Sequence, residues 1–177
     1  HEVLPEADPM RPGDPTAQTF DAMLGMLKAR FNVLGLAEGV DRLGRGTLPP
    51  AAVAISFDDG YADNVEVALP ILRKHGLTAT FFIATGYLGD GAMFNDLVIE
   101  GVRGARGDAI DAAFLGLGRL PIGTQAERCE AAQAVIRVLK YLPAEERMQK
   151  AQRVAEACGL SARPRLMTDA AGVRRLA

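Results

Sequence analysis

The sequence lacks several features that would point directly to a class of protein. It has two cysteines, too few for a disulfide framework and without the CxxC spacing of a metal site. No apolar run approaches the ~18 residues of a membrane span. Twenty Lys and Arg residues stand against 22 Asp and Glu residues, so the positive excess that nucleic-acid binding needs is absent. We expect reduced thiols, no membrane span and no nucleic-acid partner.

Length and composition indicate one folded domain. At 177 residues the chain is slightly longer than a domain of ~150 residues. Hydrophobic residues make up 49% and charged residues 24%, which excludes a wholly disordered or collagen-like chain. The opening residues, HEVLP, include no initiator Met and no basic or apolar part of a signal peptide. We expect that an upstream segment was removed or that the sequence is a fragment.

Hydrophobic spacing predicts helices and short strands at the start of the chain. Four prolines keep residues 1–15 extended. Apolar residues then recur at helical spacing as far as Phe31, with Thr16 or Thr19 as the N-cap. A short strand over 32–36 and a short helix that ends near 44–46 are expected next.

Two apolar runs on either side of a helix predict a βαβ unit. Residues 53–57 lie between a Pro pair and an Asp-Asp-Gly turn, a pattern typical of a strand buried on both faces of a parallel sheet. Residues 78–85 are a second apolar, β-prone run that ends at Gly86. The helix between them closes with Gly76 at C′, and Pro70 inside it predicts a restart or kink. This order of elements predicts a right-handed parallel crossover.

The second half of the chain predicts mainly helices. Residues 93–102 form one, and the Gly-rich residues 104–124 are predicted to be an irregular loop. The further helices expected are one over 129–139, one with Pro143 at N1 that stops at Gly159, and one capped by Thr168. We interpret 104–160 as a loop and helical insertion within a single domain, 1–177.

Asp58 and Asp59 are the residues most indicative of chemistry. They follow a predicted parallel strand, and the carboxyl ends of such strands are where α/β folds place their active sites. Two adjacent carboxylates raise each other's pKa and favour a neutralising cation, so one could hold a metal while the other transfers protons. An ordinary Asp-Asp-Gly turn is the structural alternative. A Mg²⁺ site for phosphoryl transfer is a third interpretation, disfavoured because no phosphate-binding loop with Lys or Ser/Thr follows the strand.

The residues around this pair resemble a known family. The stretch AISFDDGYADN, the helix ALPILRKHGL and the strand TATFFIATGYL are similar to the start of the polysaccharide deacetylases (carbohydrate esterase family 4, the NodB-homology domain). That family begins with a [TS]-F-D-D-G strand end, followed about one helix later by G-x-x-[AT]-T-F-F. The opening HEVLPEADP resembles the segment after a first strand ending in Tyr-His in one bacterial branch. Residues 53–100 carry the distinctive part of the resemblance.

The resemblance implies a fold and a reaction. The fold would be α/β, a partial distorted (β/α) barrel with a helical insertion after the second motif strand. The reaction would be metal-dependent removal of acetyl groups from an N-acetylated polysaccharide or oligosaccharide, with Asp58 as the catalytic base and Asp59 as the metal-binding aspartate. The metal, often zinc, would polarise the amide carbonyl and the water, and Asp58 would deprotonate that water. The resemblance leaves the compartment open between bacterial cytoplasm and cell envelope.

One part of the family pattern is missing from the sequence. The family completes its metal site with H-[ST]-x-x-H, whereas this chain has only His1 and His75. Because a catalytic zinc site usually needs three protein ligands, we expect an incomplete catalytic domain that is inactive by itself. The alternative is a non-catalytic binding or structural fragment of the same fold.

Four further residues are candidates for the substrate cleft, and each has a simpler interpretation. Tyr61 follows the Asp-Asp-Gly turn and could flank a sugar or pack in the core. Asn95 and Asp96 follow a Gly-rich loop after a strand, but could cap a helix instead. His1 could face the cleft or be a frayed terminus.

Overall fold

The structure is a computed structural model that describes residues 1–177. The chain forms two compact units, the first made of residues 1–89 and 166–177 and the second of residues 90–165. The predicted insertion at 104–160 lies inside the second unit, which begins at Asp90 and ends at Arg165. No helix combines the length and apolar character needed to cross a bilayer.

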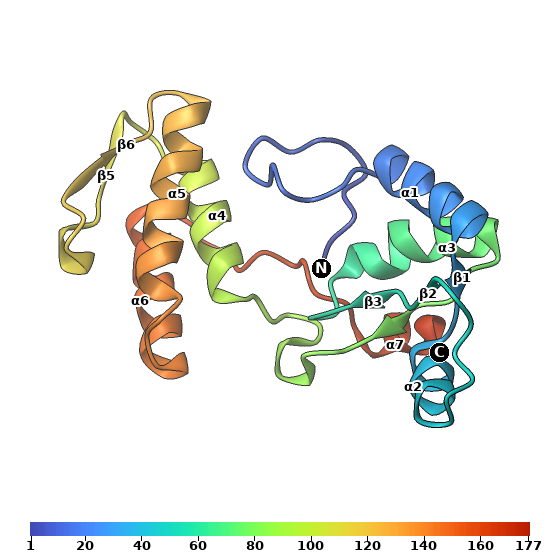
Figure 1. Cartoon of the computed structure of the whole chain (residues 1–177). Helices are drawn as coiled ribbons and strands as arrows, with labels where there is room; N and C mark the ends of the chain where they lie inside the picture. Colours follow the sequence, from blue (N-terminus) through green and yellow to red (C-terminus); the bar gives the residue numbers. More distant parts are fainter. The chain divides into compact units, whose positions relative to one another are not determined.

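The first unit contains alternating helices and short strands, labelled in Figure 1. In chain order its elements are α1 (Ala17–Arg30), β1 (Asn32–Val33), α2 (Leu36–Gly44), β2 (Ala52–Val53), β3 (Ser56–Phe57), the π-helical turn η1 (Asn64–Ala68), α3 (Leu69–His75), β4 (Thr80–Phe81), the 3₁₀ turn η2 (Thr85–Tyr87) and α7 (Ala170–Leu176). β1 pairs with β2 and β3 pairs with β4, both in parallel. The predicted βαβ unit is therefore present, because β3 and β4 pair in parallel and α3 lies between them in the chain.

The second unit is mostly helical. Its elements are α4 (Phe94–Gly104), β5 (Ala109–Asp111), the 3₁₀ turn η3 (Ala113–Leu115), β6 (Arg119–Pro121), α5 (Gln125–Leu139) and α6 (Ala144–Ala157). β5 and β6 form an antiparallel pair. The strands of the whole chain thus make three separate two-stranded sheets and no closed one. The α/β class is confirmed, and the barrel stays a prediction.

Helix boundaries follow the local chemistry of the sequence. The Thr16 hydroxyl accepts a hydrogen bond from the Thr19 amide, so Thr16 is the N-cap of α1. The predicted restart at Pro70 is present, since the π-helical turn η1 ends at Ala68 and the α-helix α3 begins at Leu69, directly before the proline. Proline has no backbone N–H to donate, so a change of helix type there is expected. Gly76 ends α3 in the left-handed conformation, with φ of 64°.

The core of the first unit joins α1, α3 and the β3–β4 pair. The Phe57 ring packs edge-on against Phe20 of α1, with centroids 5.8 Å apart, and stacks on Phe81 of β4 at 5.0 Å. Leu24 and Leu72 are buried in the same cluster. Because Phe57 directly precedes the Asp-Asp pair, this packing anchors the end of β3 from which the candidate site begins.

Several predictions about elements were wrong. Pro143 is the N-cap of α6 and not its first helical residue, and the strands predicted over 32–36 and 78–85 are only two residues long. The apolar run 53–57 is not one strand buried on both faces, since it divides into β2 and β3, each pairs with a single neighbour, and Ser56 is exposed. Residues 104–124 are not an irregular loop but contain the β5–β6 hairpin, whose connection uses Gly116 and Gly118 at positive φ. The cap of α7 is Asp169 and not Thr168, because the Asp169 carboxylate accepts the Gly172 amide at 2.7 Å.

Candidate active site

The loop that carries the two aspartates leaves β3 with an unusual backbone. Asp59 has φ of 73° and Gly60 has φ of 86°. Asp tolerates the left-handed region better than most residues, and glycine adopts it without steric cost. A Cβ on Gly60 would lie 3.0 Å from Cδ1 of Ile83. The sequence Asp-Asp-Gly therefore suits a sharp turn packed against the chain that follows β4.

Backbone hydrogen bonds fix this loop on both sides. The Ala84 amide donates to the Asp59 carbonyl at 3.0 Å, which ties the loop to the end of β4. The Thr168 amide donates to the Gly60 carbonyl at 2.9 Å, and the Ala62 amide donates to the Leu166 carbonyl at 2.8 Å. The turn is thus held between two segments that are far apart in the sequence, and its side chains project from a fixed backbone.

The two carboxylates have different surroundings. The Asp58 side chain is exposed, whereas the Asp59 side chain is 30% exposed. Burial, and after it the neighbouring charge of Asp58, raises the pKa of Asp59 above its ordinary value. The pair therefore consists of a solvent-accessible acceptor beside a carboxylate whose charge is disfavoured unless a cation or donor compensates it.

His1 supplies such a donor. Its Nδ1 lies 2.7 Å from Oδ2 of Asp59, and the imidazole is the donor in this contact when Nδ1 is protonated and Asp59 is ionised. The structure thus brings His1 and Asp59 together.

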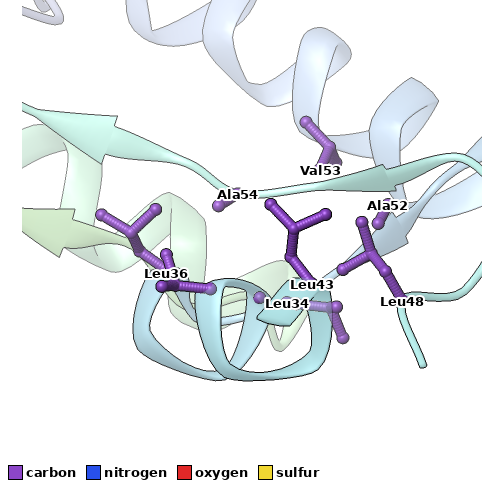
Figure 2. A pocket seen from close by; sticks show the side chains of 9 residues that line it. Leu34, Leu36, Leu43, Leu48, Ala52, Val53 and Ala54 are labelled. Carbon is purple, nitrogen blue, oxygen red and sulfur yellow. The ribbon is translucent and has the colours of Figure 1, made fainter. Parts of the chain in front are cut away.

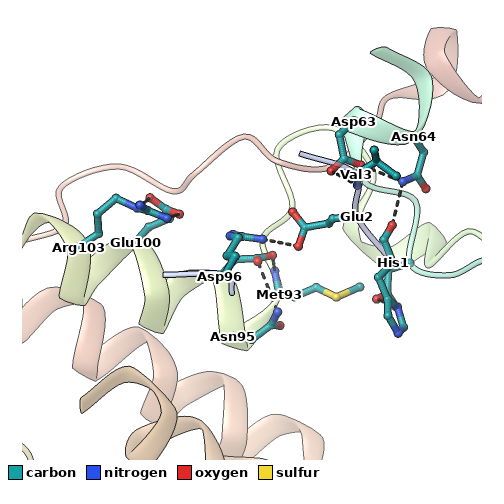
Figure 3. A network of polar contacts seen from close by, with 12 residues as sticks. His1, Glu2, Val3, Asp63, Asn64, Met93, Asn95, Asp96, Glu100 and Arg103 are labelled. Atoms are coloured by element: carbon teal, nitrogen blue, oxygen red, sulfur yellow. Dashed lines mark hydrogen bonds and ion pairs between the residues drawn. The ribbon is translucent and has the colours of Figure 1, made fainter. Parts of the chain in front are cut away.

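Two residues that sequence reasoning missed hold the segment that bears His1. The Asn64 amide nitrogen donates to the His1 carbonyl at 2.9 Å and to Asp63 at 2.8 Å, as Figure 3 shows. Asp63 in turn accepts the Val3 amide at 3.1 Å. Burial raises the pKa of Asp63 to about 6. A polar Asp-Asn pair at the start of an apolar helix was the signal that could have revealed them.

The other three candidates for the substrate cleft make contacts within the fold, and their role at a cleft stays a prediction. Tyr61 is 2% exposed and its backbone forms a bridge with Met167, so its side chain packs in the interior. In the second unit, Asp96 is fully buried and its carboxylate accepts the Met93 amide at 3.3 Å at the start of α4. Asn95 donates to Asp96 at 3.4 Å. The interpretation of this segment as a helix start agrees with these contacts, with Met93 in the cap position.

The donor set near the loop fits a metal only in part. A half-buried carboxylate beside a second carboxylate has the oxygen chemistry and the excess negative charge that a divalent cation neutralises. No three His, Cys, Asp or Glu side chains lie close enough together to hold an ion. His75, the second histidine of the chain, is hydrogen-bonded to Asp21 on α1. The loop therefore presents carboxylate oxygens but not a complete set of metal ligands.

A separate hollow in the first unit is apolar. It lies between α2 and β2, has a volume of about 210 Å³, and is lined by residues that include Leu34, Leu43, Leu48 and Val53 (Figure 2). Its lining has no group that transfers protons or binds a metal. This hollow therefore offers apolar contact surface only.

Comparison with known proteins supports the resemblance found in the sequence. Residues 45–105 match the family model of polysaccharide deacetylases. The chain is 55% identical over 31 residues to YxkH of Bacillus subtilis (strain 168), whose name describes it as a putative polysaccharide deacetylase. This match covers 18% of this chain and 11% of that protein. A solved structure of a de-N-acetylase from Aggregatibacter actinomycetemcomitans is 30% identical, with 50% of this chain and 33% of that chain covered and a TM-score of 0.41. The chain thus spans a third or less of the length of these relatives.

Proposed function

Because residues 45–105 carry the sequence of the polysaccharide deacetylase family, we propose that the chain takes part in deacetylation of N-acetylated sugars in a polysaccharide or oligosaccharide. The observation that carries the proposal is the Asp58–Asp59 pair, which stands at the end of β3 inside the matched segment. The distorted (β/α) barrel of this family is the architecture we propose for the complete catalytic domain.

The two carboxylates would have different roles, with Asp58 as the proton acceptor. Asp58 is exposed at the end of the strand, so its oxygens can accept a proton from an attacking water. The amide C–N bond then breaks, acetate forms, and the sugar nitrogen takes up a proton to leave as an amine. An unactivated amide needs this help because water is a poor nucleophile at neutral pH.

Asp59 is the residue we assign to a divalent cation, with zinc as the candidate metal. Its burial and its charged neighbour disfavour an uncompensated carboxylate, so cation binding there would be stabilised. A bound divalent cation supplies a Lewis acid for the amide carbonyl and the developing oxyanion. Asp59 alone does not complete a zinc site, and the further ligands are unassigned.

The experiment is release of acetate from an N-acetylated oligosaccharide by the complete catalytic domain, this chain joined to the rest of the proposed barrel and supplied with zinc. Asp58→Asn should reduce turnover by a factor of about 10²–10⁴, the usual contribution of a general base. Asp108→Asn, a change to an exposed carboxylate in the second unit, is the matched control and should leave turnover unchanged. Retained oligosaccharide binding without acetate release would instead favour the alternative, a non-catalytic binding module of the same fold.

A further inference from the structure

Three helices of the first unit, α1, α3 and α7, end in basic residues. These residues are Lys28 and Arg30 in α1, Arg73, Lys74 and His75 in α3, and Arg174 and Arg175 in α7. The six Lys and Arg residues among them are exposed. The chain as a whole has a formal net charge of -2, so the last turns of these helices concentrate positive charge against the overall balance.

Hydrogen bonds bring the three helix ends to one face of the unit. Lys28 on α1 donates through Nζ to the carbonyl of His75 at the end of α3, and the two helices lie side by side (Figure 1). Arg73 on α3 donates to the carbonyl of Arg175 at the end of α7, at 3.4 Å. We call this surface the basic face, and it consists of Lys28, Arg30, Arg73, Lys74, Arg174 and Arg175.

The charge of the basic face is partly compensated within the fold. Asp21 accepts hydrogen bonds from Lys74 and His75, both at 2.8 Å. The carbonyl end of each helix adds partial negative charge, equivalent to about half an elementary charge. One carboxylate and these partial charges do not balance six Lys and Arg residues, so a positive potential remains at the face.

Exposed apolar side chains accompany the basic residues at the end of α1. Phe31, the C-cap residue next to Arg30, is 41% exposed, and Met26 is 49% exposed. Met26 and Arg30 are four residues apart and therefore share one side of the helix. Basic residues with apolar neighbours are typical of surfaces that bind the headgroup region of an anionic membrane. A soluble polyanion would be matched by charge alone, so the apolar neighbours favour lipid.

The basic face lies at the far end of α3 from the Asp58–Asp59 turn. The turn leads directly into η1, which begins at Asn64, and α3 ends at His75. This length of helix separates the two ends by a distance on the order of 15 Å. A surface bound at the basic face would therefore leave the turn accessible to a polymer.

We propose that the basic face docks the first unit on an anionic phospholipid surface. The Lys and Arg side chains bind the headgroup phosphates, and Phe31 and Met26 enter the boundary between headgroups and acyl chains. This interaction goes beyond the proposed deacetylation and does not depend on it.

The test is co-sedimentation of the protein with phosphatidylcholine vesicles, with and without about one third phosphatidylglycerol. The protein should bind the vesicles that contain phosphatidylglycerol, and high salt should weaken the binding because it screens exposed charges. Arg30→Gln combined with Arg174→Gln should weaken binding by about 5-fold for each lost charge, or about 25-fold in total. Neither side chain takes part in the hydrogen bonds that join the helix ends.

The matched control is Arg106→Gln combined with Arg119→Gln. Both residues are exposed in the second unit, and the change removes the same charge from the chain. This variant should bind like the wild-type protein. Equal losses in the two double variants would mean that net charge and not the basic face decides binding, which would overturn the proposal. Equal binding of the wild-type protein to both kinds of vesicle, or to neither, would overturn it as well.

The apolar contribution separates a lipid surface from a soluble polyanion. Phe31→Ser should weaken vesicle binding by about 3- to 10-fold, since a partly buried aromatic side chain is lost, and should leave binding to polyglutamate unchanged. If Phe31→Ser does not fold, Met26→Gln takes its place. Unchanged vesicle binding in the variant, or displacement of the protein from vesicles by polyglutamate at equal charge concentration, would make an acidic polymer the partner and contradict the lipid assignment.

Discussion

Asp58 and Asp59 show how the backbone separates two identical side chains. Adjacent residues on a regular strand point in opposite directions, but the positive φ of Asp59 turns the chain directly after β3. One carboxylate remains exposed and the other becomes half-buried against His1. The sequence predicted that the pair is important, whereas the contrast between its members depends on a backbone angle and on a histidine 58 residues away.

Gly60 is the residue on which this turn depends most directly. Gly60→Ala should lower the free energy of unfolding by about 1–3 kcal/mol, because alanine is strained at φ of 86° and its Cβ would meet Ile83. The control is Gly39→Ala in α2, where no atom lies within 4 Å of the added Cβ; it should raise the free energy of unfolding by about 0.5–1 kcal/mol. Urea denaturation of both variants measures the two effects, and equal values would contradict the account of the turn.

The raised pKa of Asp63 should make the free energy of unfolding depend on pH. Burial raises its pKa from 3.8 to about 6, so the folded protein retains a proton that the unfolded chain releases. The retained proton stabilises the folded state, and this stabilisation is fully present below about pH 4. As the pH rises through 6 it is lost, which lowers the free energy of unfolding by about 3 kcal/mol in total. Unfolding measured from pH 4 to pH 7 should show the decline in the wild-type protein and a shallower one in Asp63→Asn. Identical pH profiles would rule out Asp63 as the source.

At the level of elements, helices were easier to predict than strands. The caps of α1 and α3 are local, since the Thr16 hydroxyl accepts a hydrogen bond from the Thr19 amide and Gly76, directly after the last residue of α3, adopts a left-handed backbone angle. β2 and β3 are only two residues long and depend on partners that lie 20 or more residues away. The β5–β6 hairpin was missed because the glycines that suggested an irregular loop form its connection.

The contact between α1 and α3 provides a prediction about elements. Both Oδ atoms of Asp21 lie 2.8 Å from Nζ of Lys74, and Oδ1 lies 2.8 Å from Nε2 of His75. The hydrogen bond from Lys74, followed by that from His75, lowers the pKa of Asp21. Asp21→Asn should therefore lower Tm at neutral pH. The difference should shrink as the pH falls below the ordinary carboxyl pKa of 3.8 and vanish only below the lowered pKa of Asp21, where the folded wild-type carboxylate is protonated.

The control for this prediction is Asp41→Asn. Asp41 pairs with Arg45 one turn away within α2 and both side chains are exposed, so its loss should change Tm less. Thermal melts at neutral and acidic pH compare the two variants. A Tm for Asp21→Asn equal to that of the wild-type protein at neutral pH would mean that the cluster does not join the helices.

For the whole molecule, the segment that matches the family model of polysaccharide deacetylases contains the Asp58–Asp59 pair, whereas His1, which contacts Asp59, lies outside it. Residues 45–105 contain β3, the Asp-Asp pair and β4, and extend through α4. The sequence could identify this segment because its two motifs are local. It could not identify His1, Asp63 and Asn64 as a connected group, because their contacts join the start of the chain to the first turn after β3.

The central proposal is that Asp58 transfers a proton while Asp59 holds a cation. One measurement tests it most directly: zinc content and acetate release from an N-acetylated oligosaccharide, determined side by side for Asp58→Asn and Asp59→Asn in the complete catalytic domain. The account predicts that Asp58→Asn retains its zinc and loses turnover, whereas Asp59→Asn loses both. A zinc-free Asp58→Asn variant together with a zinc-loaded Asp59→Asn variant would contradict it.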